Sequence, residues 1–416
     1  MRTERGTAPR ARTRATLGTA LLVQALCLAR PAPLLAQSAA VALQRALDSA
    51  VVDGAPGIAL AIVRDGRVVF TGNAGYADPA RAVTVSDSTT FAIGGVGRTL
   101  VAALVLELAA TGRLDLDMTA VDVVPTAAVR RVPNADAASL RQLLVHMGAV
   151  PDWERDPAWI RRARGAEYDP LRPWRSDDAL AYARWRPEEV PGRAGATVRT
   201  SATGYTLLAL AAERASGVAL ATALRTTFAE PLGLRFTTFD ASEAPRGVPA
   251  IGHHLATPEF IARAGVSQWF VRASSELVRI DPVELGPEGA GGGMRSTASE
   301  LALLFDAVRS DRVLASQVGD ELRAAQPLRA GDGATAISPG LFRTRHATGT
   351  EYNQVGSVLG FGAFAAWSDD VPLSYAILVN VGSADAGAEA EGRVRRWLLD
   401  HPWRALIRRV AAESAR

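Results

Sequence analysis

Hydrophobic and polar residues alternate along this chain with two different periods, and each period predicts one kind of element. Residues 39–50 place apolar side chains on one side of a helix, which predicts an amphipathic helix with a buried face. Residues 56–63 and 67–72 are apolar runs separated by Asp65-Gly66, a dipeptide typical of a two-residue hairpin turn. We therefore predict a helix followed by a β-hairpin.

A glycine-rich turn and a long apolar helix are predicted for residues 91–117. Gly94, Gly95 and Gly97 allow the backbone to approach its neighbours closely, and Gly112 follows the apolar run where the helix would end. The first N–H groups of a helix have no partner within it, so this turn is a candidate site for an anion or a carbonyl oxygen. The pattern alone favours a simpler interpretation, a buried helix that is entered through glycines.

Composition adds a prediction of export. The chain has 416 residues, of which 48% are hydrophobic, enough for one large domain or two closely packed ones. Residues 1–36 combine early arginines, an apolar run over 17–29 and small residues near 34–36, which is the order of a secretory signal peptide. We expect cleavage there, export of residues 37–416 to the periplasm or the extracellular space, and no membrane span afterwards. A retained anchor is the alternative, although the apolar run is short for a span.

The charges of the mature chain argue against nucleic acid as a partner and against lysine chemistry. Residues 1–36 carry six arginines and one glutamate, so their removal lowers the formal net charge from +3 to −2. Cys27 is the single cysteine and leaves with them, which excludes disulfides, thiol catalysis and cysteine metal sites. All 46 basic residues are arginine, so the chain has no lysine to act as a general base, and a guanidinium stays protonated at physiological pH.

The sequence around Gly95 resembles a known catalytic segment. Members of the serine β-lactamase and penicillin-binding-protein superfamily carry Phe-x-x-Gly-Ser-x-x-Lys at the start of a long helix. Residues 91–98 are similar, with Gly95 in place of the serine and Arg98 in place of the lysine. The hairpin with its Gly-Tyr-Ala-Asp ending at residues 75–78, and the Gly-Gly-x-x-Ser-Thr-Ala helix start after Gly291, resemble the class C β-lactamase-like hydrolases of this superfamily. The resemblance covers nearly the whole mature chain.

This resemblance implies an α/β fold in which an antiparallel sheet is flanked by helices and interrupted by a mostly helical inserted region. Within one domain, residues 37–416, the sheet region would comprise about 37–95 and 290–416, and the helical region about 96–289. The site would lie in the cleft between the two regions. A basic amphipathic helix predicted over 393–412 would pack on the sheet rather than lie on a membrane surface.

The resemblance also implies which positions form the pocket and which catalytic groups are replaced. The family's Tyr-x-Asn motif is replaced by residues 200–202, and the Lys or His of the strand that closes the site is replaced by Gln354. In the family, the serine attacks a carbonyl, the lysine and tyrosine manage the proton, and two backbone N–H groups hold the oxyanion. Those N–H groups would here belong to Gly95 and Ser357. The pocket positions are Gly95, Arg98, Thr200, Ser201, Ala202, Gln354, Gly356 and Ser357.

Three functional hypotheses follow. The first is a pseudoenzyme, with no catalytic residue, cofactor or metal, that binds a small carboxylate, a peptidoglycan-like ligand or an envelope protein, with Arg98 supplying a fixed positive charge. The second is a hydrolase of the β-lactamase, peptidase or esterase type whose machinery has moved to Ser357, Ser201 or Thr99. The third is a structural envelope protein that uses the fold as a scaffold.

Other chemically suggestive residues have simpler interpretations. His146 lacks a carboxylate partner at a recognisable spacing and is expected at a helix end or in the core, and His253-His254 lacks a further metal ligand and is expected to be structural. The four tryptophans over residues 153–185 form either a substrate rim or a packing surface. A hydroxyl at 296–297 is predicted to cap a helix, with Glu300 completing a capping box.

Overall fold

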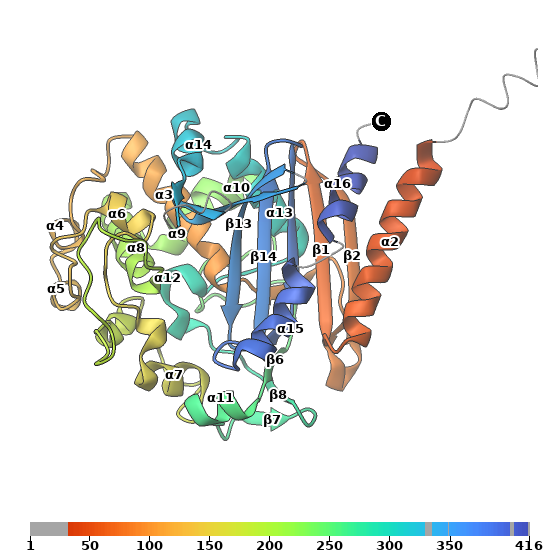
Figure 1. Ribbon diagram of the computed structural model, residues 1–416, viewed down its shortest axis with the longest axis horizontal. Coiled ribbons are helices and arrows are strands. Elements are labelled where there is room, and N and C mark those ends of the chain that lie inside the picture. Colours follow the sequence, from red (N-terminus) through yellow and green to blue (C-terminus); the bar gives the residue numbers. More distant parts are fainter. Residues whose placement is uncertain (1–31, 329–334, 348, 400–402, 415–416) are drawn as a thin grey trace, which may run out of the picture.

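The computed structural model describes residues 32–328, 335–347, 349–399 and 403–414, and the structural statements below refer to these residues (Figure 1). The helices are α2 (Ala32–Val52), α3 (Gly97–Ala110), α4 (Ala120–Val123), α5 (Ala127–Arg130), α6 (Leu140–Leu144), α7 (Pro157–Arg164), α8 (Ala202–Ser216), α9 (Leu220–Leu224), α10 (Glu230–Leu232), α11 (Pro258–Arg263), α12 (Gly289–Gly292), α13 (Ala298–Arg309), α14 (Ser316–Arg323), α15 (Ala388–Leu399) and α16 (Trp403–Glu413). The strands are β1 (Gly57–Arg64), β2 (Arg67–Asp78), β3 (Val83–Thr84), β4 (Thr89–Ala92), β5 (Val248–Pro249), β6 (Gly252–Leu255), β7 (Phe270–Arg272), β8 (Leu277–Ile280), β9 (Arg295–Ser296), β10 (Gln326–Pro327), β11 (Thr335–Ser338), β12 (Leu341–His346), β13 (Gly349–Val358), β14 (Phe361–Ser368), β15 (Leu373–Val379) and β16 (Val381–Gly382).

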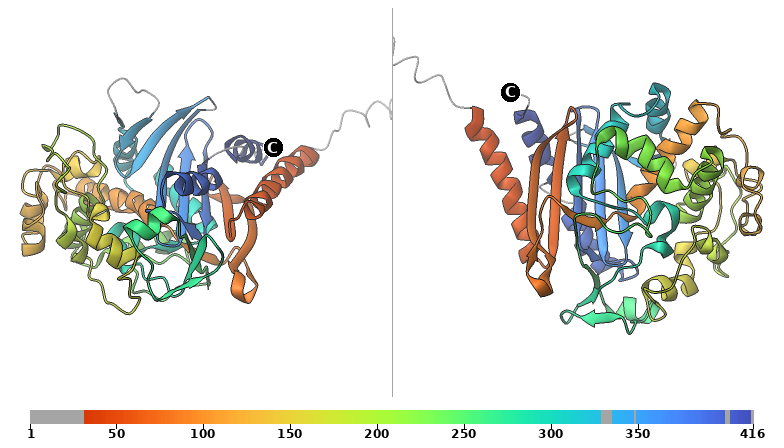
Figure 2. Two further views of the ribbon diagram at one scale, coloured as in Figure 1. Left: turned by 60° about the horizontal axis from the view of Figure 1, so that its bottom comes forward. Right: turned by 180° about the vertical axis from the view of Figure 1, so that it is seen from behind.

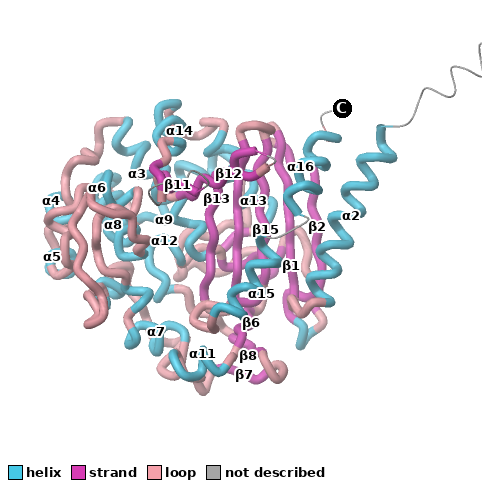
Figure 3. The backbone as a smooth tube through the Cα atoms, viewed as in Figure 1, coloured by secondary structure: helices cyan, strands magenta, loops and turns pink. Residues whose placement is uncertain are grey.

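A large antiparallel sheet forms the centre of the molecule. Its strand order is β10-β11-β12-β13-β14-β15-β1-β2-β3, so the first hairpin of the chain is inserted beside the last long strand (Figure 3). The hairpin turns at Asp65 and Gly66, whose φ angles of 49° and 76° are those of the two-residue turn that suits the strand twist. The α/β fold class and the hairpin predicted from the sequence are both confirmed.

Helices cover both faces of this sheet (Figures 1 and 2). On β14, Gly362 lies under Val394 and Leu398 of α15. Trp367 is five residues further along the strand and therefore on the opposite face, where its ring centroid is 5.8 Å from that of Phe305 of α13. Helices α2 and α16 pack against each other beside β1 and β2. The sheet thus separates two apolar layers.

The C-terminal part contains two helices, whereas the sequence predicted one over residues 393–412. Helix α15 ends at Leu399 and α16 begins at Trp403. The sequence between them includes Pro402, which lacks the N–H group that a continuous helix needs. Trp397 and Ile407 are both buried, so the predicted docking of this part on the sheet is confirmed.

The inserted region has α3 at its centre. This helix packs against α8, α12 and α14. The 3-10 turn that precedes it, Gly94–Val96, contacts β13 of the large sheet. The region also supplies β5 to a three-stranded sheet with β4 and β9. It supplies β6, β7 and β8 to a separate four-stranded sheet that β16 completes. The region expected to be mostly helical, residues 96–289, therefore also contributes strands. These strands, between residues 248 and 280, are too short for the hydrophobic pattern to predict them.

Of the expected signal segment, residues 1–36, the first 31 residues lie outside the described part of the chain. Helix α2 begins at Ala32 and contains the helix predicted over 39–50. Within the described part of the chain, no single helix has the length and apolar character needed to cross a membrane. Residues 202–216 and 220–232 meet that test only when they are joined across a bend of 76°.

Glu300 connects α13 to the inserted region. The hydroxyl of Thr297 caps the helix by accepting the N–H of Glu300 at 3.2 Å, as predicted. The Glu300 carboxylate does not complete a capping box, because it instead accepts the N–H groups of residues 235, 236 and 237 at 2.6, 3.0 and 2.7 Å. The capping-box prediction is therefore wrong, since a distant loop offers more donors than the helix start does.

We expect Glu300→Ala to lower the free energy of unfolding by about 3 kcal/mol, because three backbone N–H groups lose their acceptor at once. Urea denaturation followed by circular dichroism measures this change. Glu321→Ala is the matched control: its side chain is 50% exposed and should change stability by less than about 0.5 kcal/mol. If both variants lowered the free energy of unfolding by the same amount, the Glu300 contacts would not stabilise the fold.

Candidate functional site

The turn that carries Gly95 is held against β13 by backbone contact. Residues Gly94–Val96 form a single 3-10 turn, η2, which leads directly into α3. A Cβ on Gly356 would overlap the carbonyl oxygen of Ile93. A Cβ on Gly95 would lie 2.9 Å from the carbonyl oxygen of Val355, which is closer than real side chains approach. A serine at this position therefore requires the turn or β13 to move.

The two N–H groups expected to hold an oxyanion lie at this same contact. The nitrogen of Gly95 is 3.3 Å from the Cβ position of Gly356, and the nitrogen of Ser357 is 3.3 Å from the Cβ position of Gly94. The structure thus brings Gly95, Gly356 and Ser357 together on η2 and β13. Among them, Ser357 has an exposed side chain.

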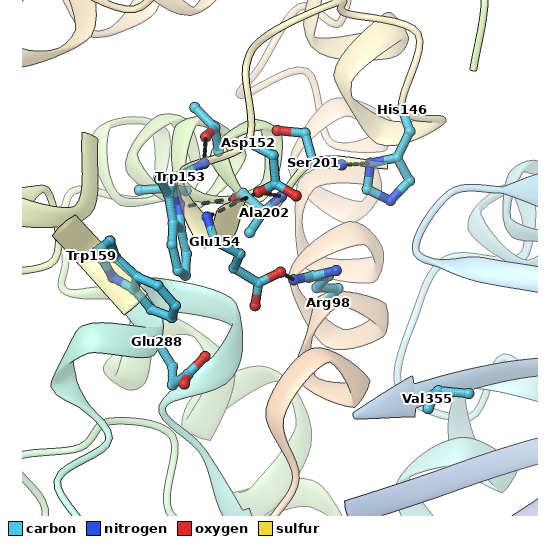
Figure 4. A network of polar contacts seen from close by, with 12 residues as sticks. Arg98, His146, Asp152, Trp153, Glu154, Trp159, Ser201, Ala202, Glu288 and Val355 are labelled. Atoms are coloured by element: carbon cyan, nitrogen blue, oxygen red, sulfur yellow. Dashed lines mark hydrogen bonds and ion pairs between the residues drawn. The ribbon is translucent and has the colours of Figure 1, made fainter. Parts of the chain in front are cut away.

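Arg98 is paired with a carboxylate. Its Nη2 donates to Oε2 of Glu154 at 3.1 Å, and Figure 4 shows Glu154 reaching Arg98 from the side opposite Val355. Burial alone would lower the pKa of Arg98, but Glu154 and then Asp152 outweigh burial and raise it. The guanidinium therefore stays charged and cannot take the role of the family's lysine.

A second buried arginine, Arg164 of α7, holds Glu154 in place. It donates from Nη2 to Oε1 of Glu154 at 3.4 Å, and from Nε and Nη2 to the two oxygens of Glu288 at 3.1 and 3.0 Å. Its Nη1 also donates to Asp385 at 3.4 Å, and its guanidinium lies 4.6 Å from the ring of Trp159. Burial favours a lower pKa for Arg164, yet the carboxylates around it raise the pKa well above its usual value. The result is a connected polar network beneath the site.

Asp152 is the carboxylate of this cluster that has no direct ion pair among the described residues. Its Oδ1 accepts the N–H groups of Ala202 and Glu154 at 3.0 and 3.3 Å. Burial, and then the neighbouring charge of Glu154, raise the pKa of Asp152 to about 7 against the opposing effect of Arg98. Asp152 therefore gains or loses a proton close to neutral pH.

Residues 200–202 lead into α8, which begins at Ala202, and include no side chain that ionises near neutral pH. The N–H of Ser201 donates to Nδ1 of His146 at 3.1 Å, and that of Ala202 donates to Asp152. Burial lowers the pKa of His146 to about 3, so its ring is neutral and accepts this bond. His146 is thus a structural residue at a helix end, as expected: it directly follows Val145, the C-cap of α6, and also binds the residue that precedes α8.

Gln354 is bound to the fold rather than presented to a ligand. Its Nε2 donates to the carbonyl oxygen of Gly340 at 2.9 Å, and the hydroxyl of Thr99 donates to the same oxygen at 2.8 Å. Both side chains are buried. The turn between β11 and β12 therefore connects α3 to β13, and Gln354 supplies no charge to the site.

An open groove lies at Asp152 and Thr200. A groove of about 1100 Å³ is bounded by residues 147–155, 185–200 and 326–328. Asp152 and Thr200 line it, whereas Gly95, Arg98 and Gln354 do not. Of the eight predicted positions, Gly95, Gly356 and Ser357 meet at the glycine turn, Thr200 borders the groove, and the other four line neither.

The tryptophans divide between packing and the groove. Trp153 and Trp159 are 1% and 0% exposed, with their ring centroids 4.6 Å apart, so they belong to the core. Trp185 lines the groove, with the guanidinium of Arg199 5.9 Å from its ring. The packing interpretation is thus confirmed for Trp153 and Trp159, and the substrate-rim interpretation stays a prediction for Trp185.

His253 and His254 lie on β6, and His254 has a structural role. The ring of His254 is buried, where it contacts the oxygen of Ala384 at 2.9 Å and accepts the N–H of Gly360 at 3.3 Å. Among the described residues, no three potential metal ligands cluster together.

Sequence reasoning missed the acidic residues of the site. Asp152 and Glu154 lie one and three residues after Pro151, and Glu288 directly precedes the glycines near 291. For Glu288, the nearby Gly-Gly motif that resembles the family was the available signal. No local pattern could show that they meet Arg98 and Arg164, because those contacts join residues far apart in the chain.

Comparison with known proteins agrees with this geometry. The family model described as Beta-lactamase matches residues 43–396. Esterase EstB of Burkholderia gladioli is 27% identical over 321 residues, which cover 73% of this chain and 78% of the esterase. The mitochondrial serine β-lactamase-like protein LACTB of Bos taurus is 28% identical over 104 residues, or 25% of this chain and 19% of that protein.

Solved structures share the fold. D-amino acid amidase from Ochrobactrum anthropi SV3, complexed with D-phenylalanine, has a TM-score of 0.73 and 20% identity over 92% of this chain and 100% of the amidase. D-stereospecific amidohydrolase from Streptomyces sp. has a TM-score of 0.70 and 22% identity over 87% of this chain and 99% of that one. At these identities the likeness concerns the fold alone.

We expect the free energy of unfolding of the Asp152→Asn variant to increase relative to that of the wild type as pH rises. A carboxyl whose folded pKa is raised to about 7 stabilises the fold below pH 4, and this contribution is lost as pH rises through 7. The asparagine cannot ionise, so the difference in unfolding free energy should grow by more than about 1 kcal/mol between pH 5 and pH 8. Urea denaturation at both pH values measures it.

Asp122→Asn is the control for this experiment. Thr119 holds the pKa of the Asp122 carboxyl below its usual value, so Asp122 is ionised in the folded and the unfolded protein at both pH values. The difference in unfolding free energy between Asp122→Asn and the wild type should therefore be the same at both pH values. The same flat profile for Asp152→Asn would contradict the raised pKa.

Proposed function

This chain belongs to the Beta-lactamase family, and from that premise we propose that it does not hydrolyse acyl substrates and instead binds a small molecule in the groove that Asp152 and Thr200 line. The fold and the framework of the site are those of a serine hydrolase. Family membership by itself leaves activity open, so the proposal depends on the site's own residues.

The observation that carries the proposal is the closed contact at Gly95. The position of the attacking serine has no side chain, and the carbonyl oxygen of Val355 lies 2.9 Å from where a Cβ would be. Loss of the nucleophile removes most of the rate of such an enzyme, and the oxyanion-binding N–H groups that remain can bind a substrate but cannot attack it.

The proton-transfer groups support the same proposal. Arg98 is permanently charged and paired with Glu154 at 3.1 Å. Thr200 replaces the tyrosine, and the amide of Gln354 is engaged by Gly340. No group in these positions can both remove and return a proton near neutral pH.

The alternative hydrolase would need another nucleophile. The hydroxyls of Ser201 and Thr99 are buried and donate to the oxygens of Pro151 and Gly340 at 3.4 and 2.8 Å. Ser357 is the exposed hydroxyl of these three, and no described histidine or carboxylate is hydrogen-bonded to it. The geometry therefore favours binding over relocated catalysis.

The groove is a better ligand site than the space around Arg98. The sequence led us to expect a small carboxylate or peptidoglycan-like ligand because of the charge of Arg98. The ion pair with Glu154 weakens that reasoning, since the charge is already compensated. An envelope protein as partner, and a purely structural role, stay predictions without a contact that favours them.

Covalent probes should leave the protein unmodified. A serine-directed fluorophosphonate and a labelled penicillin, each in excess, are expected to add no mass to the intact protein, because Gly95 has no hydroxyl. Intact-mass spectrometry gives the readout, with an active esterase of the same family as positive control. A stoichiometric adduct that disappears in Ser357→Ala would contradict the proposal.

Gly95→Ser completes this experiment, with Gly95→Ala as its matched control. Both add a Cβ next to the oxygen of Val355, so both should lose about 1–3 kcal/mol of stability. Neither should hydrolyse p-nitrophenyl acetate above background. Hydrolysis by the serine variant alone would show that the rest of the catalytic machinery is intact.

We also propose export, on the basis of the arginine-rich start and the apolar run over residues 17–29. Expression of the full chain in a bacterium, followed by fractionation and N-terminal mass analysis, should give a periplasmic or secreted protein that starts near residue 37. A cytoplasmic protein that keeps its first residues would contradict this.

A further inference from the structure

We propose that the groove beside Asp152 takes a small organic cation, whose ammonium group binds the Asp152 carboxylate and whose apolar body lies against the groove walls. This inference rests on the proposed function, because it names the class of ligand for the same groove.

Asp152 has a carboxylate oxygen that the protein does not use. Oδ1 accepts the N–H groups of Ala202 and Glu154 at 3.0 and 3.3 Å. Oδ2 accepts no hydrogen bond from the described residues, and Asp152 is part of the groove lining. Since an ionised carboxylate can accept about four hydrogen bonds, Oδ2 remains available to a donor on a ligand.

The arginines near Asp152 are engaged by other carboxylates. Arg98 donates to Glu154 at 3.1 Å, and two of the three arginines that line the groove pair with the two glutamates that line it. These pairs are Arg186 with Glu188 at 2.9 Å, Arg186 with Glu189 at 3.0 Å, and Arg155 with Glu189 at 3.5 Å. Asp152 therefore lacks a direct cationic partner among the described residues, and a ligand that supplies one removes the cost of a poorly solvated, unpaired charge.

The walls of the groove suit an apolar body next to that charge. The side chains that supply this surface are Met147, Val150, Trp185, Val190, Val198 and Leu328. A volume of about 1100 Å³ accommodates a small organic molecule. The ring of Trp185 can also stabilise a nearby cation through its face.

Asp152 disfavours an anion of the same shape, although Arg199 in the groove lining pairs with no carboxylate among the described residues. The guanidinium of Arg199 donates to the oxygen of Val190 at 2.8 Å and lies 5.9 Å from the ring of Trp185. A carboxylate in the groove would meet Asp152, with Glu154 next to it, and like charges at short range repel. Charge thus discriminates between two ligands of equal size.

The test compares three ligands that share a phenyl body. Isothermal titration calorimetry at pH 8 would use full-length purified protein with 2-phenylethylamine, 2-phenylethanol and 3-phenylpropionate. We expect the amine to bind at least about tenfold more tightly than the alcohol, and the carboxylate to bind more weakly than both. An amine that binds no better than the alcohol, or a carboxylate that binds most tightly, would overturn the inference.

Two variants assign the effect to the groove. Asp152→Asn should reduce the preference for the amine over the alcohol by about tenfold, whereas Asp122→Asn, outside the groove, should not change it. Thr200 is exposed and lines the groove, so Thr200→Arg should repel the amine without disturbing the fold, and Thr200→Gln controls for its length. Unchanged amine binding in both Asp152→Asn and Thr200→Arg would overturn the inference even if one variant folds poorly.

The outcomes separate this inference from the proposed function. Absence of amine binding in a protein that covalent probes do not label overturns the cation groove alone. Covalent labelling at Ser357 overturns the proposed function alone, whether or not the amine binds.

Discussion

Arg98 carries a charge that no proton transfer can remove, and the polar structure of the site depends on this constraint. A guanidinium in a largely buried place needs an anion, which Glu154 supplies at 3.1 Å. Glu154 in turn contacts Arg164, whose remaining donors bind Glu288 and Asp385. Each of these groups would be costly to bury alone, so the set is stable only as a connected whole.

The same constraint explains why Asp152 differs from its neighbours. Arg98 is close enough to lower the pKa of Asp152, but its nearest contact is with Glu154. Two carboxylates thus compete for one guanidinium, and the one without a direct ion pair is the one whose pKa is raised to about 7. At the other side of the turn, glycines at 95 and 356 allow η2 and β13 to meet through their backbones. At the family's nucleophile position the backbone of β13 therefore leaves no room for a Cβ, whereas the groove lies at Asp152.

Local signals in the sequence predicted the elements well. Asp65-Gly66 fixed the hairpin turn, the glycines before α3 marked its start, and Thr297 capped α13 as expected, because each signal acts within a few residues. The contacts of Glu300 and of Glu154 could not be predicted in this way, since their partners are distant in the chain. The resemblance placed Gly95 and Arg98 correctly on the turn and helix, but no motif described which acid would neutralise the arginine.

The hydrogen bonds at the start of α8 hold two walls of the groove in fixed positions relative to each other. Two walls of the groove, residues 147–155 and 196–200, are joined at their base by the bonds from Ser201 to His146 and from Ala202 to Asp152. Backbone bonds from Gly195 to Met147 and from Arg199 to His146 add to this connection. Separating the walls would uncap a 15-residue helix. The groove is in this sense preorganised: a ligand that fits it need not order these two segments, and less of its interaction energy is lost to conformational entropy on binding.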